Sequence, residues 1–248
     1  MSRLCRLSLA ALAAPLALAL AACGDSAEEE GAPTGEPIAA IAAPAGTSWV
    51  ETAAVTPEGG YVIGNPEAPL KLVEYASHTC HVCADFSKQG AAPMDEYVAT
   101  GVVSYELRNL IRDPIDLSIA LLARCGSPQA FHPLANQAWG SFDDLMATVQ
   151  ANGAALQQAQ SAPTAQRFQA IAEAAGLLDF FAARGISRDQ AMQCLADTGK
   201  AQEIATASQT QADELEITGT PTFFLNGRKL EPTSWTALEP VLQAAGAR

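Results

Sequence analysis

The sequence predicts an α/β fold in which a helical region interrupts a sheet and the helices that cover it. A short, largely apolar run at residues 70–75 is typical of a strand, and a helical pattern follows it from Cys80. Helix signals then dominate residues 113–200. An Asn-Gly pair at residues 226–227 lies between two extended runs, which indicates a β-hairpin.

The composition is that of an acidic chain that can fold. Its 248 residues include 14 Lys and Arg against 27 Asp and Glu, a formal net charge of −13. A nucleic-acid partner is unexpected, because phosphate binding needs a basic surface. The hydrophobic fraction of 49% permits a core and argues against wholesale disorder.

Residues 1–22 have the pattern of an export signal. Arg3 and Arg6 precede an uncharged, largely apolar run of 16 residues. That run is shorter than the roughly 20 residues of a membrane-spanning helix and suits a signal peptide. Cys23 directly follows Leu-Ala-Ala, which resembles the lipobox of bacterial lipoproteins, so we expect Cys23 to be the lipidated first residue of the mature chain. A plain signal peptide with an incidental cysteine and a weak membrane anchor are the alternatives.

Residues 23–57 are expected to form the lipobox cysteine and a flexible tether. The segment is rich in Gly, Ala and Pro, carries the acidic run 28–30, and has few large apolar side chains. Such a stretch cannot bury enough apolar surface to offset the entropy of ordering it. It would hold a folded domain clear of a membrane surface.

The strand at residues 70–75 contains one carboxylate, Glu74, six residues before Cys80. In a central strand this side chain would be buried near Cys83, and desolvation would raise its pKa. It would then accept or return the Cys83 proton during thiol exchange. A surface carboxylate at a strand end is the alternative.

Cys80-His81-Val82-Cys83 lies where that strand passes into the following helix. The first-turn N–H groups of a helix are unpaired and its dipole is positive there, so a thiolate at Cys80 is stabilised. Cys83 lies one turn deeper, where its thiol is shielded and can resolve a mixed disulfide. The pattern therefore favours redox chemistry at this pair.

Two other interpretations compete with redox catalysis. His78, Cys80, His81 and Cys83 form a donor set that suits Cu(I), which suggests a metal-handling protein. An inert structural bridge in an adhesive or structural lipoprotein is the third hypothesis. Haem attachment is excluded because Ala84, and not His, follows the pair. A zinc ribbon would need a second close Cys or His pair.

The remaining cysteines favour a second disulfide. Because Cys80 and Cys83 pair locally, Cys125 with Cys194 is the economical second bridge. The helix of Cys125 is opened by Asp113-Pro114, and that of Cys194 by a capping box that starts with Ser187. Two buried free cysteines are the alternative.

The C-terminal region predicts a strand, the hairpin and a final helix. Pro221, in the run Gly-Thr-Pro-Thr-Phe, stands at the first position of the strand, where its missing N–H does least harm. Residues 235–245 then show a helical period with one apolar face.

A strand leading to C-x-x-C on a helix, followed far downstream by Gly-Thr-Pro-Thr-Phe and an Asn-Gly hairpin, resembles the thioredoxin fold. The helical stretch between the two halves resembles the DsbA-like disulfide oxidoreductases. The resemblance implies an α/β thioredoxin fold with an inserted all-helical domain. Its parts would be residues 58–112 and 201–248 for the thioredoxin-like domain and residues 113–200 for the insertion.

The resemblance also implies roles for individual residues. Cys80 would be the attacking thiolate, Cys83 the resolving thiol and Glu74 the family's buried acid. Pro221 would be a cis-proline facing the sulfurs, and Thr220 would offer backbone groups to a substrate strand. No dissociable cofactor is implied. The partners would be thiols and disulfides of exported proteins, and a membrane quinone-linked reoxidant of the DsbB kind.

The chain departs from the family's usual Pro-His dipeptide, because His81-Val82 stands between the two cysteines. The extra pair Cys125 and Cys194 resembles a subgroup with a second disulfide. We expect an extracytoplasmic enzyme that forms disulfides, with a reduction potential in the oxidising half of the range from about −270 to −120 mV. A reductase or isomerase of the same fold is the alternative.

Overall fold

A computed structural model describes residues 35–248. The predicted export signal, residues 1–22, and the predicted lipidation site Cys23 lie outside the described residues. Within the described part, no helix is long and apolar enough to cross a membrane.

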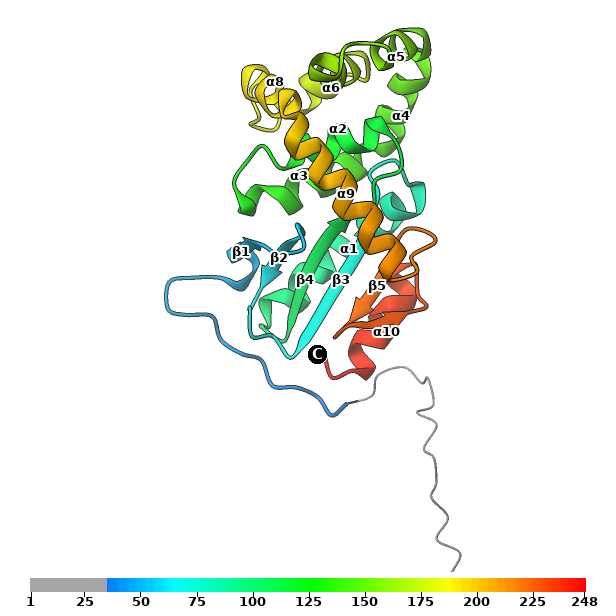
Figure 1. Cartoon of the computed structure of the whole chain (residues 1–248). Coiled ribbons are helices and arrows are strands. Elements are labelled where there is room, and N and C mark those ends of the chain that lie inside the picture. The colour runs from blue at the N-terminus through cyan, green and yellow to red at the C-terminus, as the bar shows by residue number, and fades with distance from the viewer. Residues whose placement is uncertain (1–34) are drawn as a thin grey trace, which may run out of the picture. The chain divides into compact units, whose positions relative to one another are not determined.

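The centre of the fold is a six-stranded mixed sheet with the order β1-β2-β4-β3-β5-β6 (Figure 1). β3 and β4 are parallel, and every other neighbouring pair is antiparallel. The strands are β1 (Ala53–Val55), β2 (Tyr61–Gly64), β3 (Leu70–Ala76), β4 (Val103–Asn109), β5 (Thr222–Leu225) and β6 (Arg228–Leu230).

β3 is the strand that leads to the cysteine pair, and it lies between β4 and β5. Its central position explains why the predicted run at residues 70–75 is largely apolar, since both faces of an inner strand are covered. In the register, Glu74 lies opposite Leu107 of β4 and Phe223 of β5. The parallel β3–β4 pair requires a crossover, which α1 (His81–Ala99) supplies.

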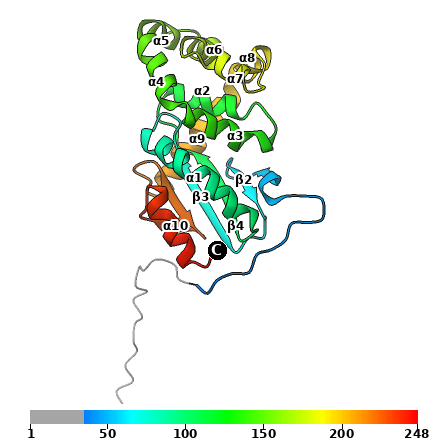
Figure 2. The ribbon, with the colours of Figure 1, turned by 180° about the vertical axis from the view of Figure 1, so that it is seen from behind.

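Two helices cover one face of the sheet, and a third lies across the other. α1 and α10 (Trp235–Ala244) pack side by side, where the ring of Trp235 lies against Gly90 (Figure 2). α9 (Thr198–Glu214) crosses the opposite face (Figure 1). The first face buries an apolar cluster that includes Phe86, Phe223 and Leu238.

The other helices form a layer at the end of the sheet where β3 and β4 finish (Figures 1 and 2). Asp113 caps the first of them by accepting hydrogen bonds from two backbone N–H groups, and Pro114 occupies the first turn. The helices are α2 (Pro114–Ala123), α3 (Pro128–Gly140), α4 (Phe142–Ala151), α5 (Gly153–Gln160), α6 (Thr164–Ala174), α7 (Leu177–Ala182) and α8 (Arg188–Ala196).

One helix, α9, extends across the predicted end of the helical insertion at residue 200. α9 runs from Thr198 to Glu214, so it passes through that boundary without a break. Asp197 caps this helix, because its side chain accepts a hydrogen bond from the Lys200 backbone N–H.

The expected tether does not extend to residue 57. A short 3-10 helix, η1 (Trp49–Glu51), and β1 lie within the predicted segment, and β1 pairs with β2. Further upstream, Ile41 N donates to the Thr100 carbonyl. Backbone hydrogen bonds of this kind do not depend on large side chains. The Gly-, Ala- and Pro-rich composition of the segment therefore could not predict that it is ordered.

Candidate active site

Cys80 and Cys83 lie at the beginning of α1, and both are free thiols in the structure. Cys80 is the N-cap residue, and its carbonyl accepts the first helical hydrogen bond, from Ala84 N at 3.1 Å. Cys83 is fully buried one turn deeper, and Cys80 is only 3% exposed. The pair therefore occupies the strand-to-helix junction that the sequence pattern indicated.

A loop from the C-terminal part of the chain closes over the first cysteine. Cys80 Sγ lies 3.3 Å from the Thr220 carbonyl oxygen, to which the protonated thiol donates. The Thr220–Pro221 peptide bond is cis, and β5 begins at the next residue. The structure thus brings together two predicted site segments that lie 140 residues apart in sequence.

The pKa values of the two cysteine thiols are shifted in opposite directions. A hydrogen bond from the Cys83 thiol lowers the pKa of Cys80 to about 5 from its ordinary 9.0, against the effect of burial. A hydrogen bond with Thr220 and the first-turn backbone amides add to this effect. Burial raises the pKa of Cys83 far above that value, and its bond to Cys80 and the nearby Glu74 add to the rise. At neutral pH Cys80 is therefore a thiolate and Cys83 a thiol.

Glu74 is buried beneath the pair, on β3, with 1% of its surface exposed. Burial is the main reason why its pKa is raised from 4.5 to about 8, although the Tyr105 hydroxyl donates a hydrogen bond to Oε2 and opposes the rise. Among the described residues, the other oxygen, Oε1, has no hydrogen-bond partner. Glu74 is thus a buried acid that can change protonation near neutral pH.

The donor set considered for Cu(I) does not assemble. The His78 ring is buried, stacks on Trp139 and has Nδ1 3.3 Å from Asn109 Nδ2, whereas His81 is exposed on the surface of α1. Within residues 35–248, no group of three or more His, Cys, Asp or Glu side chains is arranged to hold a metal ion.

Several residues that contact this region carried no sequence signal. Tyr105 meets Glu74 only because β4 lies beside β3, a pairing that the local pattern does not specify. Asp116 and Trp139, from the helical layer, bond to the residues just before Cys80. An Asp in the first turn of a helix is ordinarily explained by the helix dipole, so its burial could not be anticipated.

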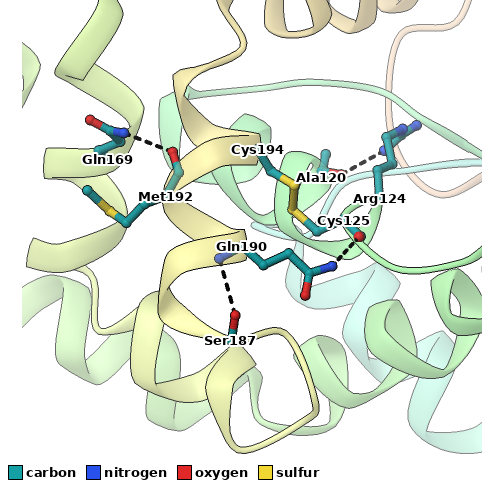
Figure 3. The surroundings of a disulfide bond; sticks show 8 residues. All are labelled: Ala120, Arg124, Cys125, Gln169, Ser187, Gln190, Met192 and Cys194. Carbon is teal, nitrogen blue, oxygen red and sulfur yellow. Dashed lines mark hydrogen bonds between the residues drawn. A yellow bond between two sulfur atoms is a disulfide. The ribbon is translucent and has the colours of Figure 1, made fainter.

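Cys125, two residues after the end of α2, forms a disulfide with Cys194 of α8, and their Cα atoms are 6.0 Å apart (Figure 3). Gln190 links the two sides of the disulfide. Its side chain donates a hydrogen bond to the Cys125 carbonyl at 2.7 Å, and its backbone N–H donates one to Ser187 Oγ at 3.2 Å. Gln169 donates to the Met192 carbonyl of the same helix. The bridge joins two helices of the insertion and lies apart from the Cys80–Cys83 pair in sequence.

Comparison with known proteins agrees with this architecture. A family model described as "Thioredoxin" matches residues 56–244. The crystal structure of a protein-disulfide isomerase from Novosphingobium aromaticivorans is 30% identical, with a TM-score of 0.72, and the match covers 77% of this chain and 98% of that one. Wolbachia pipientis alpha-DsbA1 has a TM-score of 0.59 at 22% identity, over 75% and 89% of the two chains, and so shares the fold.

A curated relative from Rickettsia typhi, named "Putative protein-disulfide oxidoreductase", is 27% identical over 171 residues. The match covers 68% of this chain but only 56% of that relative. The predicted DsbA-like thioredoxin fold with an inserted helical region is confirmed by the structure and these matches. Because this family model matches well over half of the chain, residues 56–244, the chain belongs to the thioredoxin family.

Proposed function

We propose that this protein catalyses thiol–disulfide exchange on exported proteins, most often in the direction of disulfide formation. The observation that carries the proposal is the arrangement at the start of α1. There the Cys80 sulfur accepts a hydrogen bond from the Cys83 thiol and lies 3.3 Å from the Thr220 carbonyl, next to the cis bond to Pro221. A nucleophile, a resolving thiol and the backbone of the loop that would take a substrate strand then meet at one place.

In the oxidising direction, a substrate thiolate attacks Cys80 Sγ of the Cys80–Cys83 disulfide. The substrate–Cys80 bond forms, and Cys83 leaves and takes up a proton. A second substrate thiolate then attacks the substrate sulfur of the mixed disulfide, and Cys80 leaves as a thiolate. The substrate gains a disulfide, and two electrons remain on the enzyme as one thiolate and one thiol.

Glu74 is the group placed to manage the Cys83 proton. Its charge interacts with Cys83, and its pKa of about 8 allows it to give or take a proton near neutral pH. In this proposal Glu74 donates the proton when Cys83 leaves and accepts it when the pair is reoxidised.

The oxidising direction follows from the charge of Cys80. A thiolate stabilised to a pKa of about 5 is a good leaving group, and its stability favours the reduced pair over the disulfide. The structurally similar Novosphingobium protein is described as a disulfide isomerase, so isomerisation by the same pair is the second candidate.

The remaining parts of the proposal concern place and partners. Cys23 would carry the lipid that holds the domain at an extracytoplasmic membrane surface. A DsbB-like membrane protein would accept the electrons of the reduced pair and pass them to quinone. Lipidation is tested by mass spectrometry of the mature N-terminus, with Cys23→Ser as the control.

The activity is tested by the oxidative refolding of reduced ribonuclease, together with the reduction potential of the pair in glutathione buffers. Oxidised wild type should restore ribonuclease activity, and Cys80→Ala should not. Cys83→Ala treated with oxidised glutathione should accumulate a mixed disulfide between Cys80 and glutathione. A potential near about −270 mV would reverse the proposed direction. Equal refolding by wild type and Cys80→Ala would reject the function altogether.

A further inference from the structure

The residues between β3 and α1 are held by the helical layer. We call residues 77–79, with the sequence Ser-His-Thr, the active-site turn. They link the end of β3 to Cys80. Ser77 and His78 are buried, so most of the turn is shielded from solvent. What holds the turn therefore decides where Cys80 lies.

The principal contact is the carboxylate of Asp116, in the first turn of α2, which is completely buried. Its Oδ1 accepts the backbone N–H of His78 at 2.8 Å. Its Oδ2 accepts the Ser77 hydroxyl at 2.7 Å and the backbone N–H of Arg112 at 3.0 Å. The His78 Nδ1 atom lies 3.5 Å from Oδ1. A buried carboxylate with this many donors is a strong anchor, because charge-assisted hydrogen bonds are roughly twice as strong as neutral ones.

Two more contacts come from the same layer. Trp139 of α3 donates its ring N–H to the Ser77 carbonyl at 3.0 Å and stacks on the His78 ring. The Thr79 hydroxyl donates to Asp113, the N-cap of α2. All three turn residues are thus bonded to α2 or α3, and the His78 ring also contacts Asn109 at the end of β4.

The active-site turn contacts both cysteines of the redox pair through Ser77. The Cys80 N–H donates to the Ser77 carbonyl at 3.3 Å. The Ser77 backbone also makes a hydrogen bond with the Cys83 thiol. A displacement of the turn would therefore change how the two sulfurs meet each other and the first amides of α1.

We propose that Asp116 is a positioning residue for the redox pair: by holding the active-site turn against α2, it fixes Cys80 at the N-terminus of α1. This inference rests on the proposed function, and it gives the helical insertion an indirect part in the chemistry. Asp116 touches neither sulfur and acts only through the turn.

Asp116→Asn is the matching perturbation, because it keeps the size of the side chain. The two carboxylate oxygens each accept a backbone N–H, from His78 and from Arg112. An amide has only one oxygen, so in either orientation its NH2 group faces one of these donors. The variant therefore loses a contact that no rotation of the side chain restores.

The test measures the pH dependence of iodoacetamide alkylation at Cys80 in the reduced, full-length protein. In the wild type, half of the Cys80 side chains are thiolates near pH 5. At that pH, a rise of one unit in the pKa of Cys80 lowers the thiolate population roughly fivefold. We expect Asp116→Asn to slow alkylation at pH 5 by at least that factor. Asp143→Asn, at an exposed position that pairs with Lys88 of α1, is the control and should leave the rate unchanged.

Circular dichroism of each variant separates positioning from loss of fold. A folded Asp116→Asn protein with reduced stability but wild-type alkylation at pH 5 would overturn the proposal. If that variant does not fold, Ser77→Ala decides, since it removes one donor to Asp116: a slower alkylation supports the proposal, and an unchanged rate rejects it. Alkylation needs no protein substrate, so it stays informative even if ribonuclease refolding shows the proposed function to be wrong.

Discussion

Replacing Glu74 by glutamine should stabilise the protein, and increasingly so as the pH rises. The pKa of this buried carboxyl is raised from 4.5 to about 8. Between these two values the folded protein holds a proton that the unfolded chain has lost, so stability falls with rising pH in this window. Glutamine does not titrate, and its side-chain oxygen still accepts the Tyr105 hydroxyl. The unfolding free energy of the variant therefore does not fall with rising pH on account of this residue.

The size of the effect follows from the two pKa values. Each pH unit between them costs about 1.4 kcal/mol of unfolding free energy. The advantage of Glu74→Gln should be below about 1 kcal/mol at pH 5, about 3 kcal/mol at pH 7 and between about 4 and 5 kcal/mol at pH 8.5. The sign is that of a group with a raised pKa in the folded state, whose contribution is complete below pH 4.5 and lost as the pH passes about 8.

The assay is urea unfolding of both proteins, reduced, at pH 5, 7 and 8.5. The two chains share every other titrating group, so the large contributions of Cys80 and Cys83 cancel in the difference apart from their coupling to Glu74. A difference that stays constant with pH would show that Glu74 titrates normally and is not desolvated. A Glu74→Gln protein less stable than wild type at pH 8.5 would refute the reasoning outright.

Three further outcomes are expected. Replacing Cys125 and Cys194 by alanine should lower the unfolding free energy by about 4 kcal/mol, because their bridge spans a sequence separation of 69; equal urea midpoints would contradict this. Alkylation of reduced Cys80 should rise with pH around a midpoint near 5, and a midpoint near 9 would show an ordinary thiol. Gly90→Ala should cost about 1–3 kcal/mol in thermal unfolding, since a Cβ there would lie 2.9 Å from the Trp235 ring; unchanged stability would contradict this packing.

The elements around the redox pair were predictable because their signals are local. Asp113-Pro114 marks a helix start through its own hydrogen-bonding and backbone preferences, and the structure begins α2 there. The Asn226-Gly227 pair requires positive φ at both positions, which these residues tolerate, and it joins β5 to β6. The strand pattern before Cys80 and the helical pattern after it likewise placed Cys80 at the start of a helix.

The contacts that tune the site were not predictable, because they join segments whose proximity depends on the whole fold. Tyr105 reaches Glu74 only through the β3–β4 pairing, and Asp116 reaches the active-site turn only after α2 has packed against it. The segment at residues 35–57 is a third case, since its order comes from backbone bonds such as that of Ile41 to Thr100. Such bonds leave no trace in hydrophobic periodicity.

The way the chain enters the domain has a geometric consequence. Gly35 N donates to the Ala244 carbonyl and Ile38 N to that of Gly246, so the first described residues run beside the C-terminus. Ile41 is bonded just past the last turn of α1, whereas Cys80 caps its first turn. A helix of 19 residues is about 28 Å long. The first described residues therefore join the domain near one end of α1, and Cys80 lies at the other end, about one helix length away.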